Sequence, residues 1–209
     1  GDEALALTTA AATKLTEIDA SGMTNDAAVS INTNASGSAS LLVKGTTKND
    51  TIQIDNALTL TSTLYTGGGS DTVTVVGGGT GDHTMKFNAT ALNAGDLKAG
   101  DSTVVNITGV AAGDKVTIDL TSALEALLKT GGTTLAGLAA TTAIKGVALG
   151  ASTNITASQA GGNMDLQFDL NGDGVYSATD DAQIRLVGTG TDDTLVYNAS
   201  TDQLIFTVV

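Results

Sequence analysis

A turn rich in Gly and Asp, followed by a short strand-like segment, recurs along this chain of 209 residues. Two copies span residues 45–54 and 67–75, with Asp50 and Asp71 lying 21 residues apart, and a third spans residues 188–197. Within the copies, apolar and polar residues alternate, which is typical of half-buried strands. Because one such unit cannot bury its apolar side alone, the recurrence predicts units that stack on one another.

The sequence therefore predicts a mainly β protein with a β-solenoid or β-roll-like arrangement, and it leaves a β-sandwich with glycine-rich hairpins open. The presence of 26 Gly, no Pro and only 3% aromatic residues favours short strands joined by tight turns. One or two short helices are also expected. Residues 122–129 carry Ser, Glu and Lys where helix ends favour them, and a second helix is expected near residues 135–140.

This pattern divides the chain into three regions. Residues 1–14 are expected to form a connector or a short helix, and residues 15–120 a repetitive β region. Residues 121–209 are expected to form a C-terminal β region that holds the short helix and a calcium loop.

The predicted calcium loop reads Asp-Leu-Asn-Gly-Asp-Gly-Val-Tyr-Ser-Ala-Thr-Asp-Asp over residues 169–181. Oxygen-bearing side chains fall at positions 1, 3, 5 and 9 of the loop, Gly at position 6 and Asp at position 12, which is the spacing of an EF-hand-type loop. The expected metal ligands are Asp169, Asn171, Asp173, the carbonyl of Val175, Ser177, Asp180 and Asp181. Position 12 usually carries Glu, so the sequence leaves open whether Asp180, Asp181 or water completes the shell. The alternative is a plain Asx/Gly turn between two strands.

The composition restricts the partners. The formal net charge of −13, with nine scattered Lys and Arg, argues against nucleic acid and suits a calcium-rich exterior. No apolar run reaches transmembrane length, so no membrane insertion is expected. Without Cys, the fold is expected to be held by packing and by metal.

The residues do not favour an enzyme. The single His, His83, adjoins Asp82 in a Gly-rich turn and is expected to be solvated. Zinc would require more His or Cys ligands than the chain contains. Residues 77–82 lack the Gly-Lys-Ser/Thr end of a phosphate-binding loop. Glycosidase chemistry by a carboxylate pair stays open among 22 acidic residues, but no pair stands out.

Residues 15–23, the Gly/Asp turns, the segment 113–120 and the calcium loop together resemble the C-terminal regions of RTX-like proteins. These are bacterial cell-surface proteins, among them surface-layer proteins and large adhesins, that leave the cell by type I secretion. The resemblance implies an extracellular location and an uncleaved export signal, for which residues 203–209 have the right character. It also implies calcium bound in Gly/Asp turns. Since successive copies of the repeat are not adjacent here, one or two weaker sites are implied, at Asn49, Asp50, Gly67, Gly69 and Asp71.

The function expected from residues and resemblance together is that of an extracellular, calcium-binding structural protein that self-assembles into a surface layer, filament or adhesin. Its expected partners are other copies of itself and a cell-surface glycan. Two alternatives stay open. One is a carbohydrate-binding or adhesive domain, which would place one of Tyr65, Tyr176 or Tyr197 near a calcium site. The other is the export and stability domain of a secreted hydrolase.

Overall fold

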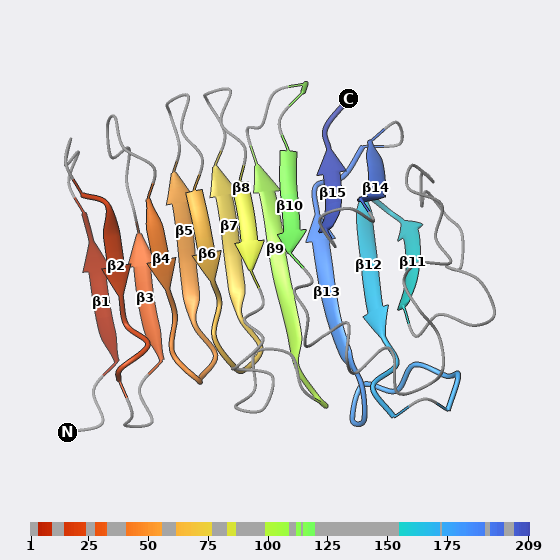
Figure 1. Ribbon diagram of the computed structural model, residues 1–209, viewed down its shortest axis with the longest axis horizontal. Coiled ribbons are helices and arrows are strands. Elements are labelled where there is room, and N and C mark those ends of the chain that lie inside the picture. The colour runs from red at the N-terminus through yellow and green to blue at the C-terminus, as the bar shows by residue number, and fades with distance from the viewer. Residues whose placement is uncertain are drawn as a thin grey trace.

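The computed structural model describes residues 4–9, 15–23, 28–32, 41–55, 62–76, 83–86, 99–108, 112–113, 115–119, 155–171, 173–190, 193–198 and 203–209. These residues form an eight-stranded and a seven-stranded sheet and contain no helix (Figure 1). The prediction of a mainly β protein is confirmed.

Each sheet draws strands from the whole length of the chain. The larger sheet has the order β1 (Leu5–Thr8), β3 (Val29–Asn32), β5 (Thr51–Asp55), β7 (Thr72–Val76), β9 (Ser102–Thr108), β13 (Ala182–Val187), β12 (Asn163–Phe168) and β11 (Ile155–Ala160). The smaller sheet has the order β14 (Thr194–Asn198), β15 (Gln203–Thr207), β10 (Lys115–Asp119), β8 (His83–Lys86), β6 (Ser62–Tyr65), β4 (Leu42–Lys44) and β2 (Glu17–Asp19).

From β1 to β10, successive strands alternate between the two sheets. Each strand pairs in parallel with the strand two places further along the chain. Over this range, the strands of one sheet run opposite to those of the other (Figure 1). Successive strand pairs, such as β3 with β4 and β5 with β6, therefore stack side by side, and equivalent residues of neighbouring pairs lie next to each other. After β10 the pattern changes, because β11, β12 and β13 pair antiparallel, as do β14 and β15. Strand β13 then joins β9, and β15 joins β10.

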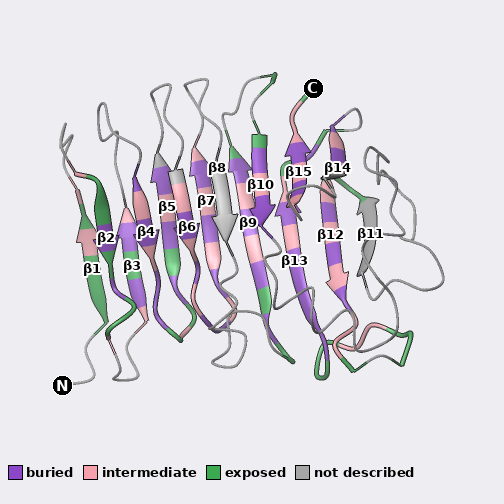
Figure 2. Ribbon diagram, viewed as in Figure 1, coloured by how far each residue is buried: buried purple, intermediate pink, exposed green. Residues whose placement is uncertain are grey.

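The core lies between the sheets and consists of apolar rows that run across the strands. Along β5 and β7 the buried residues alternate with less buried ones, as the sequence predicts (Figure 2). One row in the larger sheet consists of Leu7, Ile31, Ile52, Val73, Val105, Leu186 and Met164. The facing row in the smaller sheet includes Ile18, Val43, Leu64, Ile118 and Leu204. Aliphatic side chains thus supply most of a core that contains few aromatic residues.

Some expectations about individual segments can be compared with the structure. Within residues 1–14, where the sequence left a connector or a short helix open, residues 5–8 form strand β1, which pairs with β3. Strands β12 and β13 flank residues 169–181. The helices expected at 122–129 and near 135–140 lie outside the described residues.

The stacked rows make a prediction about stability. Ile52 is 0% exposed in the middle of its row, whereas its neighbour Thr51 is exposed on the outer side of β5. We expect Ile52→Ala to lower the free energy of unfolding by about 2–5 kcal/mol, because it removes buried methylenes and leaves a cavity. Thr51→Ala should change it by less than about 0.5 kcal/mol. Urea unfolding followed by circular dichroism measures both, and equal effects of the two substitutions would contradict the assigned register.

Candidate functional site

The loop of residues 169–181 connects β12 to β13, two antiparallel neighbours in the larger sheet. It is therefore carried by a hairpin, as the sequence predicts, and both its ends are fixed by the ladder between Phe168 and Ala182. An oxygen-lined loop on a paired hairpin has little freedom at its base. Its side chains can converge only by folding of the loop itself.

The first half of the hairpin loop folds through three consecutive contacts from side chain to backbone. Asp169 Oδ2 accepts a hydrogen bond from the Gly174 N–H at 2.8 Å. Asn171 Oδ1 accepts one from the Asp173 N–H at 2.9 Å, and Asp173 Oδ1 accepts one from the Val175 N–H at 2.8 Å. Gly174 adopts a φ of 83°, which an L side chain rarely tolerates. These contacts hold the Asp169, Asn171 and Asp173 side chains against the loop backbone, and an oxygen that accepts one hydrogen bond has a second lone pair.

In the second half of the hairpin loop, the adjacent residues Asp180 and Asp181 differ in burial and in hydrogen bonding. Asp181 is fully buried, and its two oxygens accept hydrogen bonds from the Leu170 N–H at 2.8 Å and the Ser177 N–H at 2.7 Å. Asp180 is exposed, with Oδ2 at 3.3 Å from both the Ser177 Oγ and the Thr179 Oγ1. Asp181 therefore ties the loop to its hairpin, whereas Asp180 stays on the accessible side. Among the described residues, no three His, Cys, Asp or Glu side chains are grouped as a metal would require.

A second group of candidate residues lies in two turns that stack directly on each other, residues 45–50 and 66–71. The Gly45 N–H donates to the Tyr65 carbonyl at 2.8 Å, and the Gly68 N–H donates to the Thr46 carbonyl at 3.0 Å. The Asn49 side chain accepts a hydrogen bond from the Ser70 N–H at 2.9 Å. Gly67, with a φ of 84°, lies so close that a Cβ there would overlap the Thr46 carbonyl oxygen. The weaker sites expected at Asn49, Asp50, Gly67, Gly69 and Asp71 thus come together in one place.

The Asp50 carboxylate connects its own turn with the neighbouring strand. Its Oδ2 accepts a hydrogen bond from the Thr46 N–H at 2.6 Å, within the turn. Its Oδ1 accepts one from the Val29 N–H at 2.9 Å, at the start of β3. Burial raises the pKa of Asp50, and the hydrogen bonds from Val29 and Thr46 oppose that rise. The Asp50 carboxylate thus accepts hydrogen bonds from N–H groups at the start of one strand and in the turn before another, as a capping side chain does at a helix end.

Two other aspartates have the same two-sided arrangement. Asp181 accepts from Ser177 in its own turn and from Leu170 across the loop. Asp193 accepts from the Gly190 N–H in its own turn and from the Val209 N–H, at 3.1 Å, at the end of the chain. Sequence reasoning found the Gly/Asp turn before Asp193 but not this contact with residue 209. The sequence signal that could have indicated a structural role for Asp193 was the recurrence of the Gly/Asp turn. We refer to Asp50, Asp71, Asp181 and Asp193 as the turn aspartates.

Asp71 is the exception among the turn aspartates. Its Oδ1 accepts a hydrogen bond from the Asp50 N–H at 2.9 Å, but its buried Oδ2 has no partner among the described residues. Burial raises the pKa of Asp71 to about 8, the hydrogen bonds from the Asp50 N–H and the Thr66 side chain oppose that rise, and the charges of Asp50 and Asp101 add to it. A buried carboxylate oxygen without a partner is costly unless it binds a proton or a cation. The stacked turns therefore contain one oxygen that suits a cation.

The raised pKa of Asp71 predicts a pH dependence in the presence of a chelator. The folded state keeps the Asp71 proton up to a pH of about 8, whereas an unfolded chain loses it near the ordinary value of 3.8. The stability that this proton contributes is complete below pH 4 and is lost as the pH rises to about 8. We therefore expect the free energy of unfolding to fall between pH 5 and pH 8, by up to about 1 kcal/mol per pH unit.

Two variants make this pH dependence specific. Asp71→Asn is always neutral and should reduce the slope to the part that the raised pKa of Asp50 contributes, measured by chemical unfolding at successive pH values in EDTA. Asp19→Asn should leave the slope unchanged, because the hydrogen bonds from Lys44 and Ser21 lower the pKa of Asp19 to about 2. A slope that is undiminished in Asp71→Asn would assign the effect to other groups.

The two aspartates at the end of the hairpin loop are expected to differ in structural importance. Asp181→Ala leaves the N–H groups of Leu170 and Ser177 without their acceptor, so we expect a loss of about 1–3 kcal/mol in the free energy of unfolding. Asp180→Ala, at the exposed neighbour, should cost less than about 0.5 kcal/mol in chelator. Thermal and urea unfolding of both variants measures these losses. A larger loss in Asp180→Ala than in Asp181→Ala would contradict the structural role given to Asp181.

The described residues include no helix that is long and apolar enough to cross a lipid bilayer. Comparisons of the chain with protein-family models, with curated proteins and with solved structures find no match. The turn aspartates and the hairpin loop are therefore the features from which a function can be inferred.

Proposed function

We propose that this protein is an extracellular, calcium-binding structural protein that assembles with copies of itself at a bacterial cell surface. The observation that carries the proposal is the unpartnered, buried Oδ2 of Asp71, which lies where two Gly/Asp turns stack. The resemblance of the sequence to RTX-like secreted proteins points the same way. A structural role is favoured because these carboxylates connect strands to one another.

The alternation of strands between two sheets supports a β-roll type of solenoid. Neighbouring strand pairs are in register from β1 to β9. Asp50 and Asp71 occupy the same register position, directly before β5 and β7. A solenoid places equivalent turns in one line along its edge. Each added strand pair would then bring another oxygen-rich turn next to the previous one, where a cation can bridge them.

Calcium in the hairpin loop would add a second clamp at the C-terminal end. The residues that would hold the ion are Asp169, Asn171, Asp173, the Val175 carbonyl, Ser177 and Asp180. All provide oxygen, which calcium prefers, and the hydrogen bonds of the first three side chains hold them against the loop backbone. Asp181 would support the loop without binding the ion, because its carboxylate is fully buried and both its oxygens hold backbone N–H groups of the loop. With a net charge of −13, the chain would gain stability from each bound divalent ion.

The proposal predicts that calcium stabilises the fold. We expect the midpoint of thermal unfolding to rise with millimolar CaCl2 and to fall with EDTA, and a free calcium concentration of 100 times the Kd would contribute about 2.7 kcal/mol. Magnesium should have a smaller effect, because it requires near-ideal octahedral geometry and gives up its bound water reluctantly. Differential scanning calorimetry in each ion measures this. An unchanged midpoint on chelation would overturn the metal-coupled proposal.

Matched variants separate the two calcium positions. Asp169→Asn with Asp173→Asn should remove the part of the calcium effect that belongs to the hairpin loop, and Asp71→Asn the part that belongs to the stacked turns. Asp165→Asn serves as the control, since Asp165 pairs with Arg185 on the outer side of β12 and β13. Calcium titration by calorimetry gives the number of ions lost in each variant. Equal losses in the control would show that general charge, and not these sites, accounts for the binding.

A further inference from the structure

The end of the molecule formed by β1 and β2, which we call the open end, has both sheets terminating side by side. Within the described residues, β1 has the single neighbour β3, and β2 has the single neighbour β4. Both strands are more exposed than the strands further inside (Figure 2). An edge strand presents N–H and C=O groups that another strand can pair with.

The hydrogen bonds at this end show which backbone groups face outward. The Thr9 N–H donates to the Asn32 carbonyl, so odd-numbered residues of β1 face β3. The Ala20 N–H donates to the Lys44 carbonyl, and Thr16 accepts from Leu42, so even-numbered residues near β2 face β4. Successive residues of a strand direct their backbone groups to opposite sides. The groups of Ala6 and Thr8 in β1, and of Glu17 and Asp19 in β2, therefore face away from the rest of the sheet.

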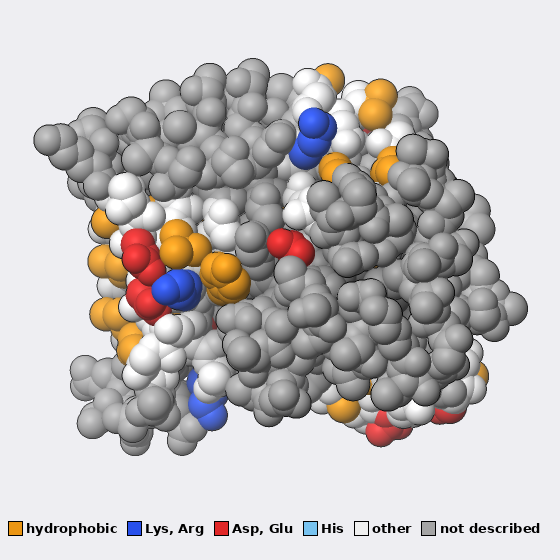
Figure 3. All heavy atoms as spheres, viewed as in Figure 1, with side chains coloured by type: hydrophobic (Ala, Val, Ile, Leu, Met, Phe, Trp, Pro, Cys, Tyr) orange, Lys and Arg blue, Asp and Glu red, His pale blue; other side chains and the backbone are white. Residues whose placement is uncertain are grey.

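The apolar core also reaches the open end. Leu5 shares a register position with Val29, yet Leu5 is 44% exposed and Val29 is 1% exposed. Leu7 is only partly buried, although it continues the row of Ile31 and Ile52. Hydrophobic side chains accordingly appear at this edge of the surface (Figure 3). A further pair of strands would cover both the leucines and the outward backbone groups.

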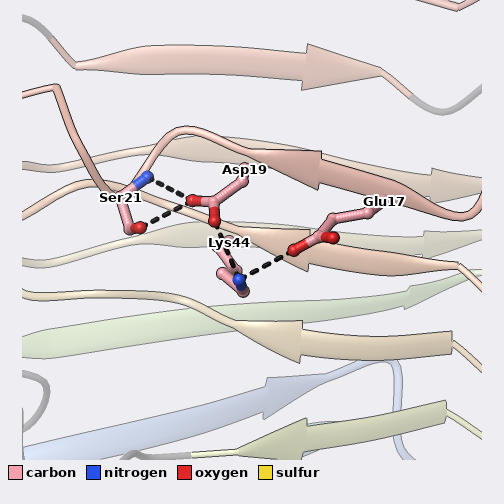
Figure 4. Close-up of polar contacts among 4 residues, drawn as sticks. All are labelled: Glu17, Asp19, Ser21 and Lys44. Carbon is pink, nitrogen blue, oxygen red and sulfur yellow. Dashed lines mark hydrogen bonds and ion pairs between the residues drawn. The ribbon is translucent and has the colours of Figure 1, made fainter.

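Charge distinguishes the two edges of the open end. Glu17 and Asp19 project from β2, where the Lys44 ammonium binds Glu17 at 2.7 Å and Asp19 at 2.8 Å (Figure 4). Two carboxylates thus share one cation, and β2 keeps an acidic excess. Strand β1, with the sequence Leu-Ala-Leu-Thr, has no charge. Pairing β2 with a second β2 would place acidic side chains opposite each other, which is unfavourable, whereas pairing it with β1 would not.

We propose that two copies of this chain join at their open ends around a twofold axis, with β1 of each copy pairing with β2 of the other. Because β1 and β2 run in opposite directions, this twofold axis makes both new pairings antiparallel (Figure 1). The axis lies along the strands and places the larger sheet of one copy in line with the smaller sheet of its partner. The proposal rests on the self-association proposed above, and it names the surface and symmetry of one contact.

Cysteine cross-linking tests the pairing directly, because the natural chain contains no Cys. Ala6→Cys places a thiol on the outer side of β1, and Glu17→Cys or Asp19→Cys places one on the outer side of β2. We expect oxidised dimers when an Ala6→Cys protein is mixed with a β2 variant, and few when any single variant is oxidised alone. Opposed side chains on neighbouring antiparallel strands lie close enough for a disulfide.

A backbone substitution provides an independent measurement. Ala6→Pro removes an outward N–H of β1 and leaves the N–H groups that face β3, so the monomer should keep its unfolding midpoint while the dimer dissociates. Ala6→Ser keeps the N–H and should stay dimeric. Size-exclusion chromatography with light scattering, in CaCl2, measures the mass of each variant.

The outcomes separate this inference from the proposed function. Cross-linking of Ala6→Cys with itself would overturn the β1–β2 pairing in favour of β1–β1. Larger assemblies that persist in Ala6→Pro, without mixed cross-links, would overturn the open-end contact and leave self-assembly intact. A wild-type chain that stays monomeric in calcium at all concentrations would overturn both this contact and the proposed self-assembly.

Discussion

The buried carboxylate that joins a turn to the neighbouring strand is the interaction on which this structure depends. Stacked parallel strands need an acceptor where each incoming strand begins, because the first N–H groups lie outside the ladder. Asp50 supplies that acceptor at the start of β3 with one oxygen and closes its own turn with the other. Asp193 likewise closes its own turn, and its second oxygen accepts from Val209, beyond the end of β15. A carboxylate in this position is costly to bury, so the same residues that define the fold also make it sensitive to protons and cations.

The sequence predicts the strands well and the roles of single carboxylates poorly. Alternation around Ile52 and Val73 indicates strands because burial on one side has a period of two, and the recurring Gly/Asp turn indicates stacking. The distinction between Asp180 and Asp181 is not visible in the sequence, since it depends on which residue the β12–β13 register directs into the protein. Likewise, Leu5–Thr8 becomes a strand through its pairing with β3, a contact made with residues more than twenty positions away.

Long-range order is a second property that local patterns do not specify. Strand β13 lies beside β9 and β15 beside β10, although 73 residues lie between the end of β9 and the start of β13 and 83 between the end of β10 and the start of β15. Antiparallel pairs then complete both sheets on that side. The two ends of the molecule are therefore built differently, with parallel strands at β1 and β2 and antiparallel strands at β11 and β14.

Side-chain contacts connect the starts of successive strands of the larger sheet. Val29 donates to Asp50, Asp50 donates to Asp71, and Asp71 donates to the Thr103 hydroxyl. At the starts of β3, β5 and β7, the N–H group thus donates to a side chain that lies later in the chain, whereas Ser70 and Ser102 donate to side chains that lie earlier, those of Asn49 and Ser70. Neighbouring turns are therefore connected in both directions along the chain. A chain stopped midway would keep the N–H group at the start of its last strand without its side-chain acceptor, while the contacts of that strand with the preceding turn would be in place.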